Sequence, residues 1–70
     1  MKINPVNRIN VLISTHANKH KHYLYNEMFT FAKENKLEGD YGHDYITIND
    51  MPENLLDKLK KLGIKKIMKL

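Results

Sequence analysis

Residues 37–45, Leu-Glu-Gly-Asp-Tyr-Gly-His-Asp-Tyr, decide the fold of this 70-residue chain. They separate an amphipathic segment before them from an alternating segment after them, and two glycines interrupt them. Because glycine and aspartate favour turns, we interpret residues 38–44 as an acidic linker. The stretch is also long enough to contain a turn or an extra short strand, and the sheet topology depends on that choice.

Before this linker the sequence predicts a strand and then a helix. Residues 8–15 contain the short apolar run Val11 to Ile13, preceded by Ile9 and rich in β-branched residues, which is typical of a buried strand. From about Asn18 to Lys36 the apolar period changes to 3.6 residues, which predicts an amphipathic helix. Its apolar positions share one arc of roughly 160°, and we expect them to supply much of the core: Leu24, Tyr25, Met28, Phe29, Phe31 and Ala32.

After the linker the sequence predicts a strand, a second helix and a short final strand. Residues 45–49 alternate between apolar and polar positions, as a half-buried strand does. Asp50 and Glu53 flank Pro52 in the pattern of a capping box, and Gly63 is a natural left-handed end for the helix that follows. Residues 65–70 form the final strand of this prediction. The second helix presents four leucines on one face: Leu55, Leu56, Leu59 and Leu62.

The resulting element order, β-α-β-α-β, predicts the fold class. Strands that alternate with helices favour parallel pairing through right-handed crossovers. We therefore expect residues 1–70 to form a single small α/β domain with a three-stranded, mainly parallel sheet and two helices. An α+β fold with an antiparallel sheet is the alternative, and it applies if residues 37–45 hold an extra strand.

Size and composition limit the function classes. A chain this short buries a marginal core, so a partner or self-association as a homo-oligomer gains weight. The chain has no cysteine, which excludes disulfides and thiolate metal sites and suits a cytoplasmic location. No apolar run approaches the roughly 20 residues of a membrane span, and the first residues do not lead into a secretion signal, so we expect no membrane partner.

Positive charge is concentrated at one end of the sequence. The whole formal net charge of +4 comes from residues 51–70, which hold six lysines and two acidic residues. Arg8 is the only arginine, so the chain is poorly equipped for sequence-specific contacts with nucleic acid bases. The basic surface expected at this end protects a strand edge or contacts a binding partner, and it comprises Lys58, Lys61, Lys65, Lys66 and Lys69.

The most informative segment for function joins the first strand to the first helix. If that helix begins at Asn18, two lysines lie in its first turn and oppose the helix dipole, an arrangement that a bound anion would reverse. In the alternative interpretation the helix begins near Tyr23 and the loop is only solvated. The predicted site for an anion or an acidic partner group comprises Thr15, His16, Asn18, Lys19, His20, Lys21 and His22.

The histidines of this segment are weak candidates for a metal site. His16, His20 and His22 do not have the spacing of a known zinc motif, so we expect neither a metal nor another cofactor. In the parallel topology His43 would lie at the opposite end of the sheet from His16. The chain also has no phosphate loop, nucleophile elbow or metalloprotease motif, which argues against an enzyme.

We therefore expect a non-catalytic binding protein, a small regulator or inhibitor that docks on a larger macromolecule, most readily a protein. The abundance of Lys, Asn and Ile is typical of an AT-rich genome, and a phage or mobile element whose product acts on a host system would fit. One alternative is a nucleic-acid-binding module that contacts the phosphate backbone through Lys19, Lys21, Lys58, Lys61 and Lys65. A weaker one is a histidine-dependent nuclease or metal-binding protein.

Overall fold

The segment that the sequence analysis treats as a linker contains a strand. The computed structural model describes residues 7–70 and places β2 at Glu38–Tyr41, between α1 (Leu24–Glu34) and β3 (Tyr45–Pro52). The chain begins with β1 (Arg8–Ser14) and continues after β3 with α2 (Leu56–Lys61) and β4 (Ile67–Lys69). Short 3-10 helices at His16–Asn18 and Glu53–Leu55 precede the two α-helices.

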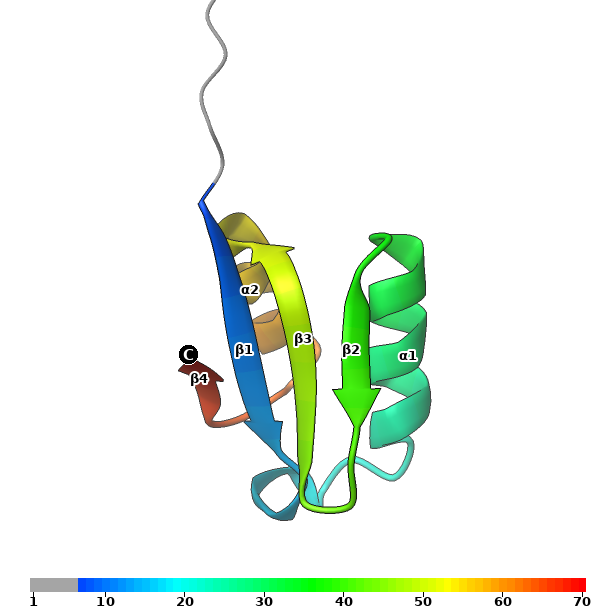
Figure 1. Ribbon diagram of the computed structural model, residues 1–70. Coiled ribbons are helices and arrows are strands. Elements are labelled where there is room, and N and C mark those ends of the chain that lie inside the picture. Colours follow the sequence, from blue (N-terminus) through cyan, green and yellow to red (C-terminus); the bar gives the residue numbers. More distant parts are fainter. Residues whose placement is uncertain (1–6) are drawn as a thin grey trace, which may run out of the picture.

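The four strands form one antiparallel sheet in the order β2-β3-β1-β4 (Figure 1). The prediction of a three-stranded, mainly parallel α/β sheet is therefore wrong, and the α+β alternative is correct. The physical reason is the tight β2–β3 hairpin, closed by a hydrogen bond from the Gly42 amide to the Tyr45 carbonyl (2.9 Å). This extra reversal makes β3 run against β1. The βαββαβ order with this strand order is the split-βαβ, ferredoxin-like arrangement.

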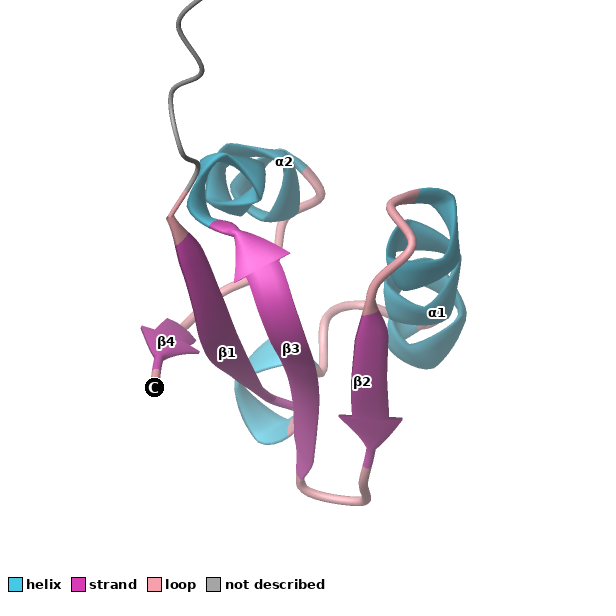
Figure 2. Ribbon diagram, turned by 45° about the horizontal axis from the view of Figure 1, so that its top comes forward, coloured by secondary structure: helices cyan, strands magenta, loops and turns pink. Residues whose placement is uncertain are grey.

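Both helices lie on the same side of the sheet, α1 near β2 and α2 behind β1 and β3 (Figures 1 and 2). The strands direct apolar side chains toward them: the paired positions Ile13 and Ile46, and Val11 and Ile48, are completely buried. The helices and the segment after α2 complete the core with Leu24, Met28, Phe31, Leu59 and Ile64. The core thus lies between the sheet and one helical layer.

Within residues 7–70, no helix lies over the opposite face of the sheet (Figure 2). Directly paired residues of an antiparallel sheet share a face, so the register places one row across all four strands, Asp40, Thr47, Leu12 and Met68. Tyr45 pairs with Ser14 on the same face. This face is therefore mixed in character, with exposed apolar groups at Tyr45 and Met68.

Asp50 lies in a β-bulge and does not cap a helix, so the predicted capping box is wrong. The register shifts between Ile9 and Val11, and Asp50 adopts a left-handed conformation with φ 54°. The Asn10 side-chain oxygen accepts a hydrogen bond from the Asp50 amide (2.8 Å), and Arg8 donates to the Asp50 carbonyl (2.8 Å). The helical turn after the strand begins only at Glu53 and has no side-chain cap.

Each α-helix ends in a Schellman motif. At the end of α1 the Lys36 and Leu37 amides donate to the Lys33 and Ala32 carbonyls, and Lys36 takes the left-handed conformation with φ 56°. The end of α2 repeats the pattern with Gly63 at φ 86°, as predicted from the sequence. No helix in residues 7–70 has the length and apolar character needed to cross a membrane.

Candidate functional site

The segment predicted to bind an anion forms a junction between three parts of the fold. We call residues 15–22 the junction; they contact the β2–β3 turn at 42–44 and residues 62–65 after α2. The helix α1 begins at Leu24 and not at Asn18, so the lysines of the segment do not lie in its first turn. The first turn holds Glu27 instead, which suits the positive end of the helix dipole.

Asn18 connects the junction to the segment before β4. Its side chain is 1% exposed, donates to the carbonyls of Ser14 (2.7 Å) and Lys65 (3.0 Å), and accepts from the Lys65 amide (2.7 Å). The amide group thus pairs with Lys65 as a neighbouring peptide unit in a sheet would. Asn18 has a structural role that leaves its side chain inaccessible to a ligand.

His20 and Lys21 contact the C-terminal end of α2. The Lys21 ammonium donates to the Leu62 carbonyl (2.5 Å) and pairs with Glu27 (2.9 Å), while the His20 ring hydrogen-bonds to the Gly63 carbonyl (3.0 Å). Carbonyls at a helix C-terminus are unpaired and carry partial negative charge, which attracts such groups. The basic residues that would conflict with α1 therefore stabilise α2.

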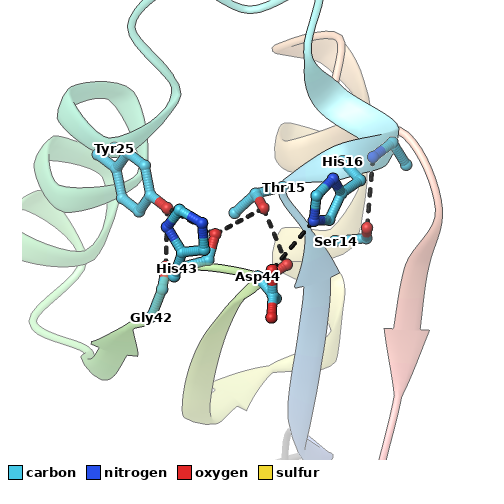
Figure 3. A network of polar contacts seen from close by, with 8 residues as sticks. Ser14, Thr15, His16, Tyr25, Gly42, His43 and Asp44 are labelled. Atoms are coloured by element: carbon cyan, nitrogen blue, oxygen red, sulfur yellow. Dashed lines mark hydrogen bonds and ion pairs between the residues drawn. The ribbon is translucent and has the colours of Figure 1, made fainter.

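Thr15 and His16 contact the β2–β3 turn (Figure 3). The Thr15 hydroxyl lies 2.9 Å from the carbonyls of both His43 and Asp44, and the His16 ring lies 3.0 Å from the Asp44 carboxylate. From the other side, the Tyr25 hydroxyl donates to the Gly42 carbonyl (2.7 Å). The turn is therefore held between the junction segment and α1.

His43 lies at the same end of the sheet as His16, in contrast to the expectation from the parallel topology. Even so, the described residues contain no group of three His, Cys, Asp or Glu side chains placed to hold a metal ion. Lys19 and His22 are exposed, and within residues 7–70 their side chains make no hydrogen bond or ion pair. Of the predicted site, these two side chains are the ones left open to a ligand.

The predicted basic surface is divided between different environments. Lys58 and Lys61 line an open groove of about 510 Å³ between α1 and α2, together with Glu27 and Glu34. Lys69 pairs with Glu53 (3.0 Å), and Lys65 and Lys66 are exposed before β4. The hydrogen bonds from Lys69 and Asn7 lower the pKa of Glu53 below its ordinary value. The five lysines are thus divided between the groove beside α2, an ion pair on β4 and the segment before β4.

The aromatic side chains are more exposed than the sequence analysis predicts. Phe31 is buried and Tyr41 half-buried, but four others are exposed: Tyr23 (70%), Tyr25 (42%), Phe29 (56%) and Tyr45 (52%). The buried arc of α1 is narrower than expected. The reason is that α1 lies beside β2 at the edge of the sheet, so the sheet covers only part of the helix (Figure 1). We call Tyr23, Tyr25, Phe29, Tyr41 and Tyr45 the aromatic surface; they lie on α1 and the residue before it, on β2 and at the start of β3. The prediction that Tyr25 and Phe29 belong to the core is therefore wrong.

A second open groove, of about 520 Å³, runs between α1 and β2. Phe29, Ala32 and Lys33 form its helical wall, Leu37 closes one end, and all four residues of β2 line it. The Phe29 and Tyr41 rings meet edge to face, with their centroids 5.9 Å apart. Partial burial raises the pKa of Tyr41 above its ordinary value of 10.0. No signal in the sequence alone reveals this groove, because it depends on β2 being a strand.

Comparisons with known proteins add no family to this description. No protein-family model matches the chain, and neither a curated protein nor a solved structure shows significant similarity to it.

Proposed function

We propose that this chain is a non-catalytic binding protein, a small cytoplasmic regulator or inhibitor that docks on a larger protein. The observation that carries the proposal is the aromatic surface. Four of the six aromatic side chains are exposed and a fifth is half-buried. Aromatic residues are enriched at protein interfaces and supply much of their binding energy.

The charge around the aromatic surface supports a protein partner over a nucleic acid. Between Tyr23 and Tyr45 the chain holds five acidic residues and two lysines, whereas six lysines follow Met51. A surface that stacks bases needs aromatic and basic side chains together, because the backbone it follows is negatively charged. Here the two kinds of side chain are concentrated in different segments.

The His16–Asp44 pair near the β2–β3 turn supports a non-catalytic role. His16 and Asp44 are both mostly exposed, and within residues 7–70 no hydroxyl or thiol is hydrogen-bonded to the His16 ring. Nucleophilic catalysis needs a base within hydrogen-bond reach of the nucleophile. The pair instead has the geometry of a surface contact that joins the junction to the turn.

The experiment that tests the proposal is affinity capture from the native host, with and without nuclease treatment. We expect a protein partner that survives nuclease and is lost from the double variant Tyr23→Ser, Tyr45→Ser. The matched control is Lys60→Ser, Lys66→Ser, which changes two exposed residues on the basic side and should retain the partner. Both variants are checked by circular dichroism and thermal unfolding.

Two outcomes would contradict the proposal. Capture of nucleic acid alone, with affinity that falls steeply as salt is raised, would identify a phosphate-binding module. A partner that is retained by the aromatic variant but lost from the lysine variant would assign binding to the basic residues instead.

A further inference from the structure

We propose that the outer edge of β2, with the groove beside α1, binds an extended segment of the partner protein as a fifth strand. The segment alternates apolar residues with lysine or arginine. This inference rests on the proposed function, since it names the site and the chemistry by which the chain would hold its protein partner.

The backbone of β2 offers the hydrogen bonds for such a strand. Among residues 7–70, β2 is the last strand on its side of the sheet and pairs only with β3. Antiparallel pairs alternate between hydrogen-bonded and non-hydrogen-bonded positions, and the Gly42 amide bonds to the Tyr45 carbonyl. Residues 42, 40 and 38 therefore direct their backbone groups toward β3. The backbone groups of Gly39 and Tyr41, which lie between them, point away from β3. These groups are the template that strand addition uses.

The groove provides a place for the apolar side chains of an added strand. It is about 520 Å³ in volume, and its helical wall presents Phe29, whose side chain is 56% exposed. Leu37 and Tyr41 add half-buried apolar surface. Every second residue of an added strand would face this wall, because strand side chains alternate in direction.

The negative charge of β2 specifies the side chains that alternate with the apolar ones in the added strand. Glu38 and Asp40 pair with Asn49 and Thr47, so both carboxylates lie on the uncovered face of the sheet, and both residues are exposed. An added strand would place its alternate side chains beside these carboxylates. Opposite charges at neighbouring cross-strand positions are favourable, so lysine or arginine fits there.

A second copy of the chain is a poorer occupant of the same edge. A symmetric β2–β2 pair that hydrogen-bonds Gly39 of one copy to Tyr41 of the other brings the two Asp40 residues directly opposite each other. Pairing Gly39 with Gly39 places Asp40 opposite Glu38. Like charges in directly opposed positions destabilise a strand pair. The acidic edge therefore favours a basic partner strand over itself.

The test is fluorescence anisotropy with a labelled seven-residue peptide that alternates lysine and valine. We expect saturable binding by the wild-type chain, and about tenfold weaker binding to a peptide whose edge-facing amides are N-methylated. A peptide of the same composition with its lysines and valines in two blocks should also bind weakly. Equal binding of all three peptides, or none by any, would overturn the inference.

Variants of the chain locate the site. Asp40→Lys should weaken the alternating peptide about tenfold or more, whereas the matched control Glu34→Lys, with the same charge change on α1, should leave binding unchanged. Tyr41→Pro removes an outward amide and a ring, and comparison with Tyr41→Ala isolates the amide. Equal loss in Asp40→Lys and Glu34→Lys would reduce the effect to net charge and contradict the site.

The same variants separate this inference from the proposed function. If the captured host protein is retained by Asp40→Lys but lost from Tyr23→Ser, Tyr45→Ser, the chain binds a protein elsewhere and only the β2 site is wrong. If the chain captures nucleic acid alone, the proposed function fails. Sedimentation that shows a dimer whose formation requires the β2 edge would assign that edge to self-association and overturn the inference.

Discussion

Asn18 is the only polar side chain that is fully buried among residues 7–70, and each of its polar atoms is paired. We expect Asn18→Ala to destabilise the chain by about 2–4 kcal/mol, because it leaves the Lys65 amide and the Ser14 carbonyl without their partners. Urea unfolding measures the change. Asn18→Asp keeps the size but loses both donated hydrogen bonds, and it should be destabilised as well. Wild-type stability in both variants would contradict the structural role.

Glu53 makes stability depend on pH. Its pKa lies below the ordinary value of 4.5 because Lys69 and then Asn7 hydrogen-bond to the ionised carboxylate. A carboxyl group with a lowered folded-state pKa stabilises the fold above its unfolded pKa and loses that contribution as pH falls through the folded value. The stability difference between wild type and Glu53→Gln should therefore be present at pH 7 and close below about pH 4. Urea midpoints across pH measure it, and a constant difference would argue against this role.

At the scale of elements, the two lysines of the segment before α1, Lys19 and Lys21, should differ in their effect on stability. Lys21→Met removes a charged donor from the end of α2 and the pair with Glu27, and it should cost about 1–2 kcal/mol. Lys19→Met changes an exposed side chain with no contact of this kind and should be neutral. Thermal unfolding of the two variants measures this. Equal stability would mean that Lys21 does not stabilise α2.

The two Schellman motifs differ in the residue that takes the left-handed conformation. The left-handed conformation is sterically strained for Lys36 but not for glycine, so Lys36→Gly should stabilise the chain by about 0.5 kcal/mol. Gly63→Ala should destabilise it by about 1 kcal/mol through the backbone alone, because an added β-carbon would meet nothing closer than the Lys21 nitrogen at 3.9 Å. Chemical denaturation checks the opposite signs. Changes of the same sign would contradict this account.

The elements that local pattern specifies were predicted well. β1, β4 and the start of β3 were placed near their observed positions, because short apolar or alternating runs mark them. The end of β3 at Pro52 was missed, because residues 50–53 were interpreted as a capping box. β2 was missed because Gly39 and Asp40 have low strand propensity. Its structure comes from pairing with β3, so closely that a β-carbon at Gly39 would overlap the Thr47 carbonyl oxygen. The pattern of residue types along the sequence does not reveal such a close approach between the backbones of two strands.

The helix start at Asn18 is wrong for a similar reason, whereas the alternative start near Tyr23 agrees with the observed start at Leu24. His20 and Lys21 look like helix residues by local criteria, but their bonds to Gly63 and Leu62 connect positions more than forty residues apart in sequence. Much of the polarity of this loop is used in hydrogen bonds within the fold. Lys19 and His22 remain the part of that prediction whose side chains are exposed and make no hydrogen bond or ion pair within residues 7–70.

At the scale of the whole molecule, one missed strand changed the sheet. Without β2 the chain has one helical crossover between its first two strands, which favours parallel pairing. With β2 the hairpin reverses the chain, and β1 becomes a central strand between β3 and β4. The β2 groove follows from this placement, and the sequence indicated it only as far as the alternative of an extra strand in residues 37–45.

The central position of β1 predicts a gradient of protection across the sheet. The backbone of β1 is paired on both sides, whereas β4 has three residues and one neighbour. Native-state hydrogen exchange should show the slowest exchange at Val11 and Ile13 and faster exchange in β4 and at the outward amides of Gly39 and Tyr41. Uniform protection in all four strands would contradict this order.

The strand order also has a consequence for synthesis. Val11 pairs with Ile48 on one side and with Lys69 on the other, both far along the chain. While the ribosome makes the intervening residues, the apolar β1 has no strand to pair with, and non-local pairing of this kind is slow and open to aggregation. A nascent chain stopped before residue 45 should therefore be unfolded and a substrate for chaperones, and folding can finish only after residue 69 has left the exit tunnel.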